Sequence, residues 1–175
     1  LLGVWSRFEL RPPPYLFLMV GSLSVGVWLA RSESGQRVAD TVPLWALVIS
    51  QAFRLPLELV MHRAATERVM PIQLSFSGYN FDIVTGATAL LVGALLYFRH
   101  CPRWLLVAWN RLGLACLAAI AAVAVSTSPL LHAFGPNSLN TWVAYFPYVW
   151  LPAGPVALAL AAHLSILRRV RTGAC

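Results

Sequence analysis

The chain has 175 residues, of which 59% are hydrophobic and only 11% are charged, and its mean hydropathy is +0.70. Soluble domains carry about 25% charged residues, so this composition excludes an ordinary water-soluble domain and favours a multi-pass membrane protein. The net charge of +7 comes from thirteen arginines and no lysine, scattered in short loops. This distribution is typical of topology signals and lipid-headgroup contacts. We expect membrane lipids as partners, leave other membrane-protein subunits open, and expect no nucleic acid.

Five apolar segments are predicted to cross the bilayer, since a spanning helix needs about 20 residues. The loops between them are short and no second domain is visible, so residues 1–175 are predicted to form a single transmembrane domain of antiparallel neighbouring helices. The predicted fold class is an all-α, polytopic transmembrane helix bundle. The segments cover about residues 14–30, 41–62, 79–98, 104–125 and 144–167.

The arginine distribution predicts the orientation of the bundle. A cytoplasmic C-terminus places seven arginines inside and four outside, in the inner (plasma) membrane of a bacterium. An odd helix count then places Leu1 outside, which predicts a sixth helix missing before the first residue. The inside set is Arg31, Arg37, Arg99, Arg103, Arg168, Arg169 and Arg171, and the outside set is Arg7, Arg11, Arg63 and Arg68.

The second apolar segment carries polar residues at helical spacing. Gln51, Arg54, Glu58 and His62 are separated by three, four and four residues, which places them on one face of a helix. A charge at the bilayer centre costs about 2.5–3.5 kcal/mol, so we expect an Arg54–Glu58 ion pair that faces protein or a wet cavity. Pro56 lies between the two charges and predicts a kink, because proline removes a backbone hydrogen bond.

The connection to the third segment adds more polar residues. Asn80 and Asp82 precede or begin the next helix, where they would act as a cap and as a charge that complements the helix dipole. They would also meet the polar face of the preceding helix. A simple clamp between helices remains the alternative to a functional site. The predicted ligand-binding set beneath this loop is Arg54, Glu58, His62, Asn80 and Asp82, with Gln51 and Gln73 beside it.

A second, weaker polar cluster is predicted from Asn110, Arg111 and His163 near the cytoplasmic ends of the last two segments. An interfacial anchor that reaches lipid headgroups is the favoured interpretation of this cluster. The aromatic residues between 142 and 150 are interpreted as an interfacial belt ahead of a proline-kinked fifth helix.

No cofactor is predicted. Glu58, His62 and Asp82 offer metal ligands, but Arg54 beside them disfavours a cation. A haem held by His62 and His163 is disfavoured because the topology places these histidines near opposite faces. Three cysteines without CxxC spacing indicate neither a disulfide framework nor a thiolate metal site, and these are Cys101, Cys116 and Cys175.

Several stretches resemble a family of uncharacterised bacterial multi-pass membrane proteins without an assigned activity. These stretches are FRLPLELVMH, PIQLSFSGYNFDIVTGATA, WNRLGLACLAAIAAVAVSTSP and FPYVWLPAGPVALALAAHLSILRR. The second stretch departs from the family's common pattern by one Glu and one Arg, which implies a less charged site. The resemblance covers most of the chain from about residue 41. It draws attention to Arg54, Glu58, Asn80, Asp82 and Asn110.

These observations favour a small integral membrane protein that binds a lipid or small polar ligand, or that docks a membrane partner. One alternative is a membrane-embedded enzyme or proton-coupled carrier, with Glu58 or Asp82 as proton acceptor, His62 as shuttle and Arg54 as anion clamp. Another is an accessory subunit of a larger membrane complex. No nucleophile elbow, phosphate loop or carboxylate pair at catalytic spacing is visible, so the sequence leaves open whether the protein is an enzyme.

Overall fold

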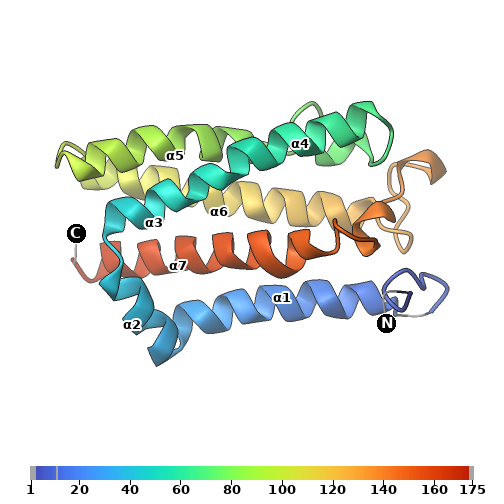
Figure 1. Ribbon diagram of the computed structural model, residues 1–175, viewed down its shortest axis with the longest axis horizontal. Coiled ribbons are helices and arrows are strands. Elements are labelled where there is room, and N and C mark those ends of the chain that lie inside the picture. The colour runs from blue at the N-terminus through green and yellow to red at the C-terminus, as the bar shows by residue number, and fades with distance from the viewer. Residues whose placement is uncertain (1–2, 11, 174–175) are drawn as a thin grey trace.

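The computed structural model describes residues 3–10 and 12–173, and every regular element within these ranges is helical. Leu1, Arg11 and Cys175, which entered the predictions above, lie outside the described residues. Successive long helices along the chain run in opposite directions, while α1 and α7 lie side by side and run in the same direction (Figure 1). The α-helices are α1 (Pro14–Arg31), α2 (Glu33–Thr41), α3 (Leu44–Ser50), α4 (Arg54–Thr66), α5 (Asp82–Tyr97), α6 (Arg103–Ser126) and α7 (Ala157–Arg171).

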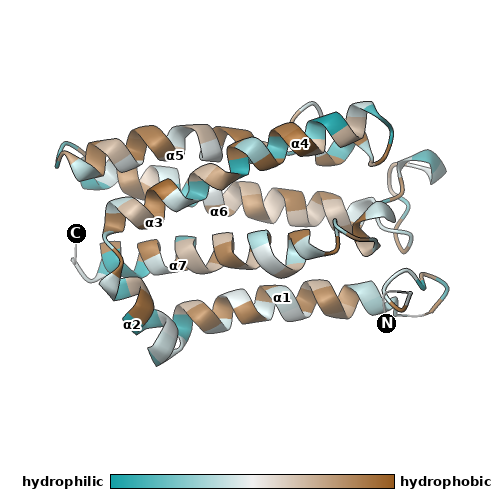
Figure 2. Cartoon of the chain, in the orientation of Figure 1, coloured by the Kyte–Doolittle hydropathy of each residue, from teal (hydrophilic) through white to brown (hydrophobic). Residues whose placement is uncertain are grey.

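Among residues 3–10 and 12–173, four helical segments are long and apolar enough to cross a membrane. They are Pro14–Arg31, Leu44–Thr66, Arg103–Ser126 and Pro152–Arg171. The predicted third span forms α5, an apolar helix of only 16 residues. Apolar residues dominate the lengths of the helices, and polar bands interrupt them along α4 (Figure 2). The helical bundle is therefore compatible with a membrane protein, and a fifth crossing by α5 stays a prediction.

The second predicted span departs from a regular helix beside its proline. A 3-10 turn, Gln51–Phe53, separates α3 from α4, and Pro56 lies in the first turn of α4. Pro56 has no N–H to donate to the carbonyl four residues earlier, so the α-helical pattern is interrupted there. The predicted start at residue 41 is wrong, because residues 33–41 form the separate helix α2.

The fifth predicted span begins later than expected. Residues 142–144 form a 3-10 turn, and the helical segment that could cross a membrane starts at Pro152 with a π-helical turn, Pro152–Val156. Trp142 is buried in the core and packs edge-on against Tyr148, with ring centroids 4.6 Å apart. The interpretation of Trp142 as part of an interfacial belt is therefore wrong, whereas Trp150 is exposed.

Two apolar clusters occupy opposite ends of the bundle. One gathers around Met61, Leu74 and Trp142, and the other around Val48 and Ile166. Helix α5 packs against α3, α4 and α6, while α7 packs against α1 and α6. Polar side chains lie at intermediate positions along the same helices, so the core has a polar layer between two apolar ones.

Arginines of α7 hold α2 against the end of the bundle. Arg168 Nη2 donates to Asp40 Oδ1 at 2.6 Å, and its Nη1 donates to Gln36 Oε1 at 3.0 Å. Arg169 donates to two backbone carbonyls at the end of α2 and just beyond it. These arginines therefore fix a helix–helix contact in addition to their predicted part in topology.

Candidate functional site

Arg54 pairs with a carboxylate of the neighbouring helix. Its Nη1 lies 3.4 Å from Asp82 Oδ1, and both side chains are buried. The predicted pairing with Glu58 is wrong, because the ion pair joins α4 to α5 instead of one turn of α4 to the next. A basic residue four positions before an acidic one is also the less favourable order for a pair within one helix.

A glycine of α5 allows this close approach. A Cβ on Gly86 would lie 2.6 Å from Leu55 N and 3.0 Å from Arg54 Cβ, both in α4. A larger residue would separate the two backbones at the level of Arg54. Small residues serve this purpose in membrane bundles, where close packing replaces a hydrophobic driving force between helices.

Glu58 binds the loop that precedes α5. Asn80 Nδ2 donates to Glu58 Oε1 at 2.7 Å and to Leu74 O at 3.2 Å. Asn80 Oδ1 accepts the backbone N–H of Asp82 at 3.1 Å, but the N-cap position of α5 is occupied by Phe81, so the predicted role of Asn80 as the cap residue is wrong. Arg54, Glu58, Asn80 and Asp82 therefore form one buried group, called here the α4–α5 cluster.

The other residues of the predicted set lie apart from this cluster. His62 is half-buried, stacks on Phe76 with ring centroids 4.2 Å apart, and places Nδ1 3.2 Å from Ser77 Oγ. Gln51 is buried and contacts its neighbour Ser50, while Gln73 donates to Ser138 Oγ at 3.2 Å. The predicted convergence therefore holds for four residues, and His62 contacts the outer part of the loop instead.

A cavity of about 100 Å³ adjoins the α4–α5 cluster. Its walls are largely apolar and come from α1, α4, α6 and the segment before α7, including Tyr15, Leu57 and Ala121. Its polar lining consists of Glu58, Asn80, Asp82, Asn140 and Trp142. An apolar cavity with a few convergent polar groups is the usual form of a small-molecule site.

Three of these lining residues have buried side-chain atoms without a hydrogen-bond partner among residues 3–10 and 12–173. The atoms are Glu58 Oε2, Asn140 Oδ1 and Trp142 Nε1. The residues are only 2%, 4% and 7% exposed, respectively. Buried polar groups normally have hydrogen-bond partners, because a buried donor or acceptor without one costs about 1–3 kcal/mol of stability. Two acceptors and one donor on residues that line the cavity thus have no partner among the described residues.

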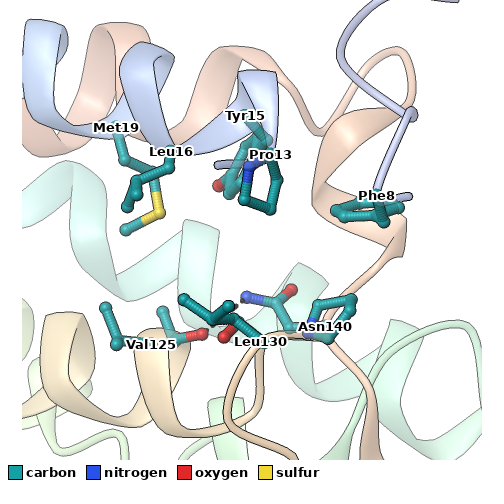
Figure 3. Close-up of a pocket in the computed structure, with 11 residues that line it drawn as sticks. Phe8, Pro13, Tyr15, Leu16, Met19, Val125, Leu130 and Asn140 are labelled. Atoms are coloured by element: carbon teal, nitrogen blue, oxygen red, sulfur yellow. Dashed lines mark hydrogen bonds between the residues drawn. The ribbon is translucent and has the colours of Figure 1, made fainter. Parts of the chain in front are cut away.

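An apolar cleft of about 50 Å³ continues from the cavity between α1 and the end of α6. Tyr15, Met19, Ala124 and Asn140 line both spaces. Figure 3 shows residues at the start of α1 facing Val125, Leu130 and Asn140 across the cleft, with Phe8 at its side. These four shared residues place the cleft directly beside the polar cavity, near the start of α1.

The polar spacing in the sequence did not predict that Tyr15, Asn140 and Trp142 line the cavity. Asn140 was missed because it lies in an irregular loop, although a polar residue two positions before the aromatic run that starts at Trp142 was a usable signal. Trp142 was assigned to an interfacial belt, and Tyr15 had no polar neighbours in the sequence. Their proximity to Glu58 depends on contacts between distant segments, which spacing along one helix does not predict.

The second predicted cluster is buried instead of interfacial. His163 Nδ1 lies 2.8 Å from Asn110 Oδ1, and Asn110 Nδ2 donates to His163 O at 3.1 Å. Both side chains are at most 1% exposed, whereas Arg111 is exposed. The favoured interfacial anchor is therefore wrong for the Asn110–His163 pair, and Arg111 is not part of it. His163 belongs to the polar layer that joins α6 to α7.

Within the part of the chain that the structure describes, no three His, Cys, Asp or Glu side chains gather closely enough to hold a metal ion. Comparisons with protein-family models, curated proteins and solved structures found no match. The family resemblance noted in the sequence thus stays a prediction, and the geometry of the cavity is the basis for any functional conclusion.

Proposed function

We propose that this chain is a multi-pass integral membrane protein that binds a small ligand in the cavity beside the α4–α5 cluster. The observation that carries the proposal is Glu58 Oε2, a buried carboxylate oxygen beside a cavity without a partner among the described residues. A ligand that bonds this oxygen would remove the cost of its desolvation.

The alternative of a simple clamp between helices accounts for only part of the α4–α5 cluster. Arg54 and Asp82 fit such a clamp, because their ion pair joins α4 to α5. Glu58 Oε1 accepts a hydrogen bond from Asn80, whereas Glu58 Oε2 has no partner among the described residues. Asn140 and Trp142 have free polar atoms beside the same space and contribute nothing to the α4–α5 contact. These three atoms favour ligand binding over a purely structural role.

We further propose a bacterial inner membrane location with a cytoplasmic C-terminus. The end of the bundle that carries the C-terminus also carries α2, the end of α5 and the start of α6 (Figure 1). Six of the seven arginines assigned to the inside lie in or directly beside these segments, and the seventh, Arg31, ends α1 at the same end of the bundle. This excess supports a cytoplasmic assignment of that end, so the ligand cavity would lie nearer the opposite surface.

Direct binding to the protein in lipid nanodiscs tests the proposed function. The probes are radiolabelled octylamine, 1-octanol and octanoate, which share one chain length and differ in the polar head. Saturable binding of at least one probe, after subtraction of empty nanodiscs, is the expected result. The matched variants are Ala121→Phe, which fills the cavity, and Ala122→Phe, which changes an exposed neighbour on the same helix.

We expect Ala121→Phe to abolish saturable binding and Ala122→Phe to preserve it. Circular dichroism and the thermal midpoint of both variants show whether the bundle remains folded. The proposed function is refuted when none of the three probes binds saturably, and also when both phenylalanine variants bind as the unmodified protein does.

A further inference from the structure

We infer that the ligand is a small amphipathic amine, whose cationic head binds beside Glu58 and whose apolar part lies in the cleft between α1 and α6. This inference rests on the proposed function, because it names the chemical class of ligand for the same cavity. Neither the composition nor the polar spacing of the sequence predicted the charge of the ligand.

The charge balance of the α4–α5 cluster favours a cationic ligand. Arg54 is its single base, and Glu58 and Asp82 are its two acids. Arg54 is engaged by Asp82, so the remaining acid is Glu58, which contacts the neutral amide of Asn80. An unpaired carboxylate in a low-dielectric interior is costly, and a cation beside it offsets that cost.

The hydrogen-bonding groups that line the cavity favour a ligand that donates hydrogen bonds. Glu58 Oε2 and Asn140 Oδ1 are acceptors and require donors. A protonated amine supplies up to three N–H donors, and its bond to a carboxylate is charge-assisted. A carboxylate ligand would instead bring a third acid beside two unpaired acceptors.

Trp142 Nε1 is the one donor among the three free atoms beside the cavity. It suits an ether, ester or hydroxyl oxygen near the amine, as in an amino alcohol or an aminolipid head. The apolar walls of the cavity then surround the carbon atoms between these polar groups.

The adjoining apolar cleft favours a ligand with a hydrocarbon segment. Tyr15, Met19 and Ala124 line both the cavity and the cleft, so the two spaces adjoin, and the proposed ligand has its head in the cavity and its hydrocarbon part in the cleft. Leu16, Val125 and Leu130 make the far part of the cleft apolar (Figure 3). A head with donors followed by a hydrocarbon segment matches this order of polar and apolar surfaces.

The nanodisc experiment tests this inference through the ranking of its probes. At pH 7 octylamine is cationic, 1-octanol is neutral and octanoate is anionic, and we expect affinity to fall in that order. A charge-assisted hydrogen bond contributes about 1.5–3 kcal/mol, which corresponds to a preference of about 10-fold or more for octylamine over octanol.

Glu58→Gln removes the charge and retains an oxygen that accepts from Asn80. We expect this variant to lose about 10-fold or more in octylamine affinity and to bind 1-octanol nearly as before. Glu67→Gln is the matched control, because Glu67 is an exposed glutamate that follows α4 and pairs with Arg63. It should leave all three affinities unchanged.

The outcomes separate the inference from the proposed function. Saturable binding in which 1-octanol or octanoate equals or exceeds octylamine overturns the inference and leaves ligand binding in place. Octylamine binding that Glu58→Gln does not weaken also overturns it, because the head would then lie elsewhere. Absence of saturable binding for all three probes overturns both. If Glu58→Gln fails to fold, the ranking of probes on the unmodified protein decides alone.

Discussion

The α4–α5 cluster and the Asn110–His163 pair are both buried and polar, yet they differ in what surrounds them. The α4–α5 cluster adjoins a cavity, and Glu58 has a free oxygen beside it. His163 Nε2 also has no partner among the described residues, but it lies against Gly113, where a Cβ would collide with its ring. Burial and polarity therefore do not by themselves indicate a binding site.

The difference lies in the packing around the free atom. The Asn110–His163 pair makes two hydrogen bonds between α6 and α7 and packs beside Trp109, with ring centroids of Trp109 and His163 5.4 Å apart. Such a pair fixes the register of two helices. The α4–α5 cluster also fixes two helices through Arg54 and Asp82. Arg54 Nη2 and Glu58 Oε2 both lack a partner among the described residues, and of these two residues Glu58 lines the cavity.

The largest effect is expected from breaking the Arg54–Asp82 ion pair. Arg54→Leu leaves Asp82 buried without its partner, and the loss of one member of a buried pair costs about 3–5 kcal/mol of unfolding free energy. Arg54→Leu combined with Asp82→Leu should recover most of this loss, since an apolar replacement of both charges is often neutral or stabilising. Titration with SDS in mixed micelles, followed by circular dichroism, measures both values.

A different result would change the comparison between the two polar regions. If Arg54→Leu costs less than about 1 kcal/mol, water or lipid reaches this position and the pair is not buried in the membrane protein. If the double variant is no more stable than the single variant, Arg54 stabilises groups other than Asp82. Either result contradicts the assignment of this pair as the structural part of the cluster.

The sequence predicted the helical bundle and the burial of Arg54 and Glu58, because both depend on local patterns. Apolar length predicted the four helical segments that are long enough to cross a membrane, and the three- and four-residue spacing placed Arg54 and Glu58 on one buried face. Asp82 was expected near Arg54, but the ion pair was assigned to Glu58, because the choice between the two carboxylates depends on the relative rotation of α4 and α5. Gly86 permits that contact, and its place opposite Arg54 depends on the same rotation.

The cavity could not be predicted from local patterns. Asn140 and Trp142 approach Glu58 from a segment about 80 residues away, and an irregular loop has no periodicity that would orient them. His163 was assigned to the interface because it precedes a run of arginines, but its ring faces α6. In each case the tertiary contact decided the role of the side chain.

A smaller effect is expected from Gly113→Ala, which tests the packing around the Asn110–His163 pair. The added methyl group would displace the His163 ring, and overpacking of this kind costs about 1–3 kcal/mol of unfolding free energy. Gly21→Ala is the matched control, because nothing lies within 4 Å of its added Cβ. Octylamine binding should be unchanged in both variants. Equal stability of the two variants would show that space remains beside His163, and the contrast with the α4–α5 cluster would then fail.

The smallest effect is expected from His62→Ala, which tests whether His62 belongs with the cavity. His62 stacks on Phe76 and contacts Ser77, so its removal should cost about 0.5–1 kcal/mol of unfolding free energy. The affinity for octylamine should remain within about twofold of the unmodified protein, because His62 does not line the cavity. A loss of octylamine affinity as large as that of Glu58→Gln would instead join His62 to the ligand. The boundary of the site would then extend along α4 to the outer loop, as the spacing of the polar residues first predicted.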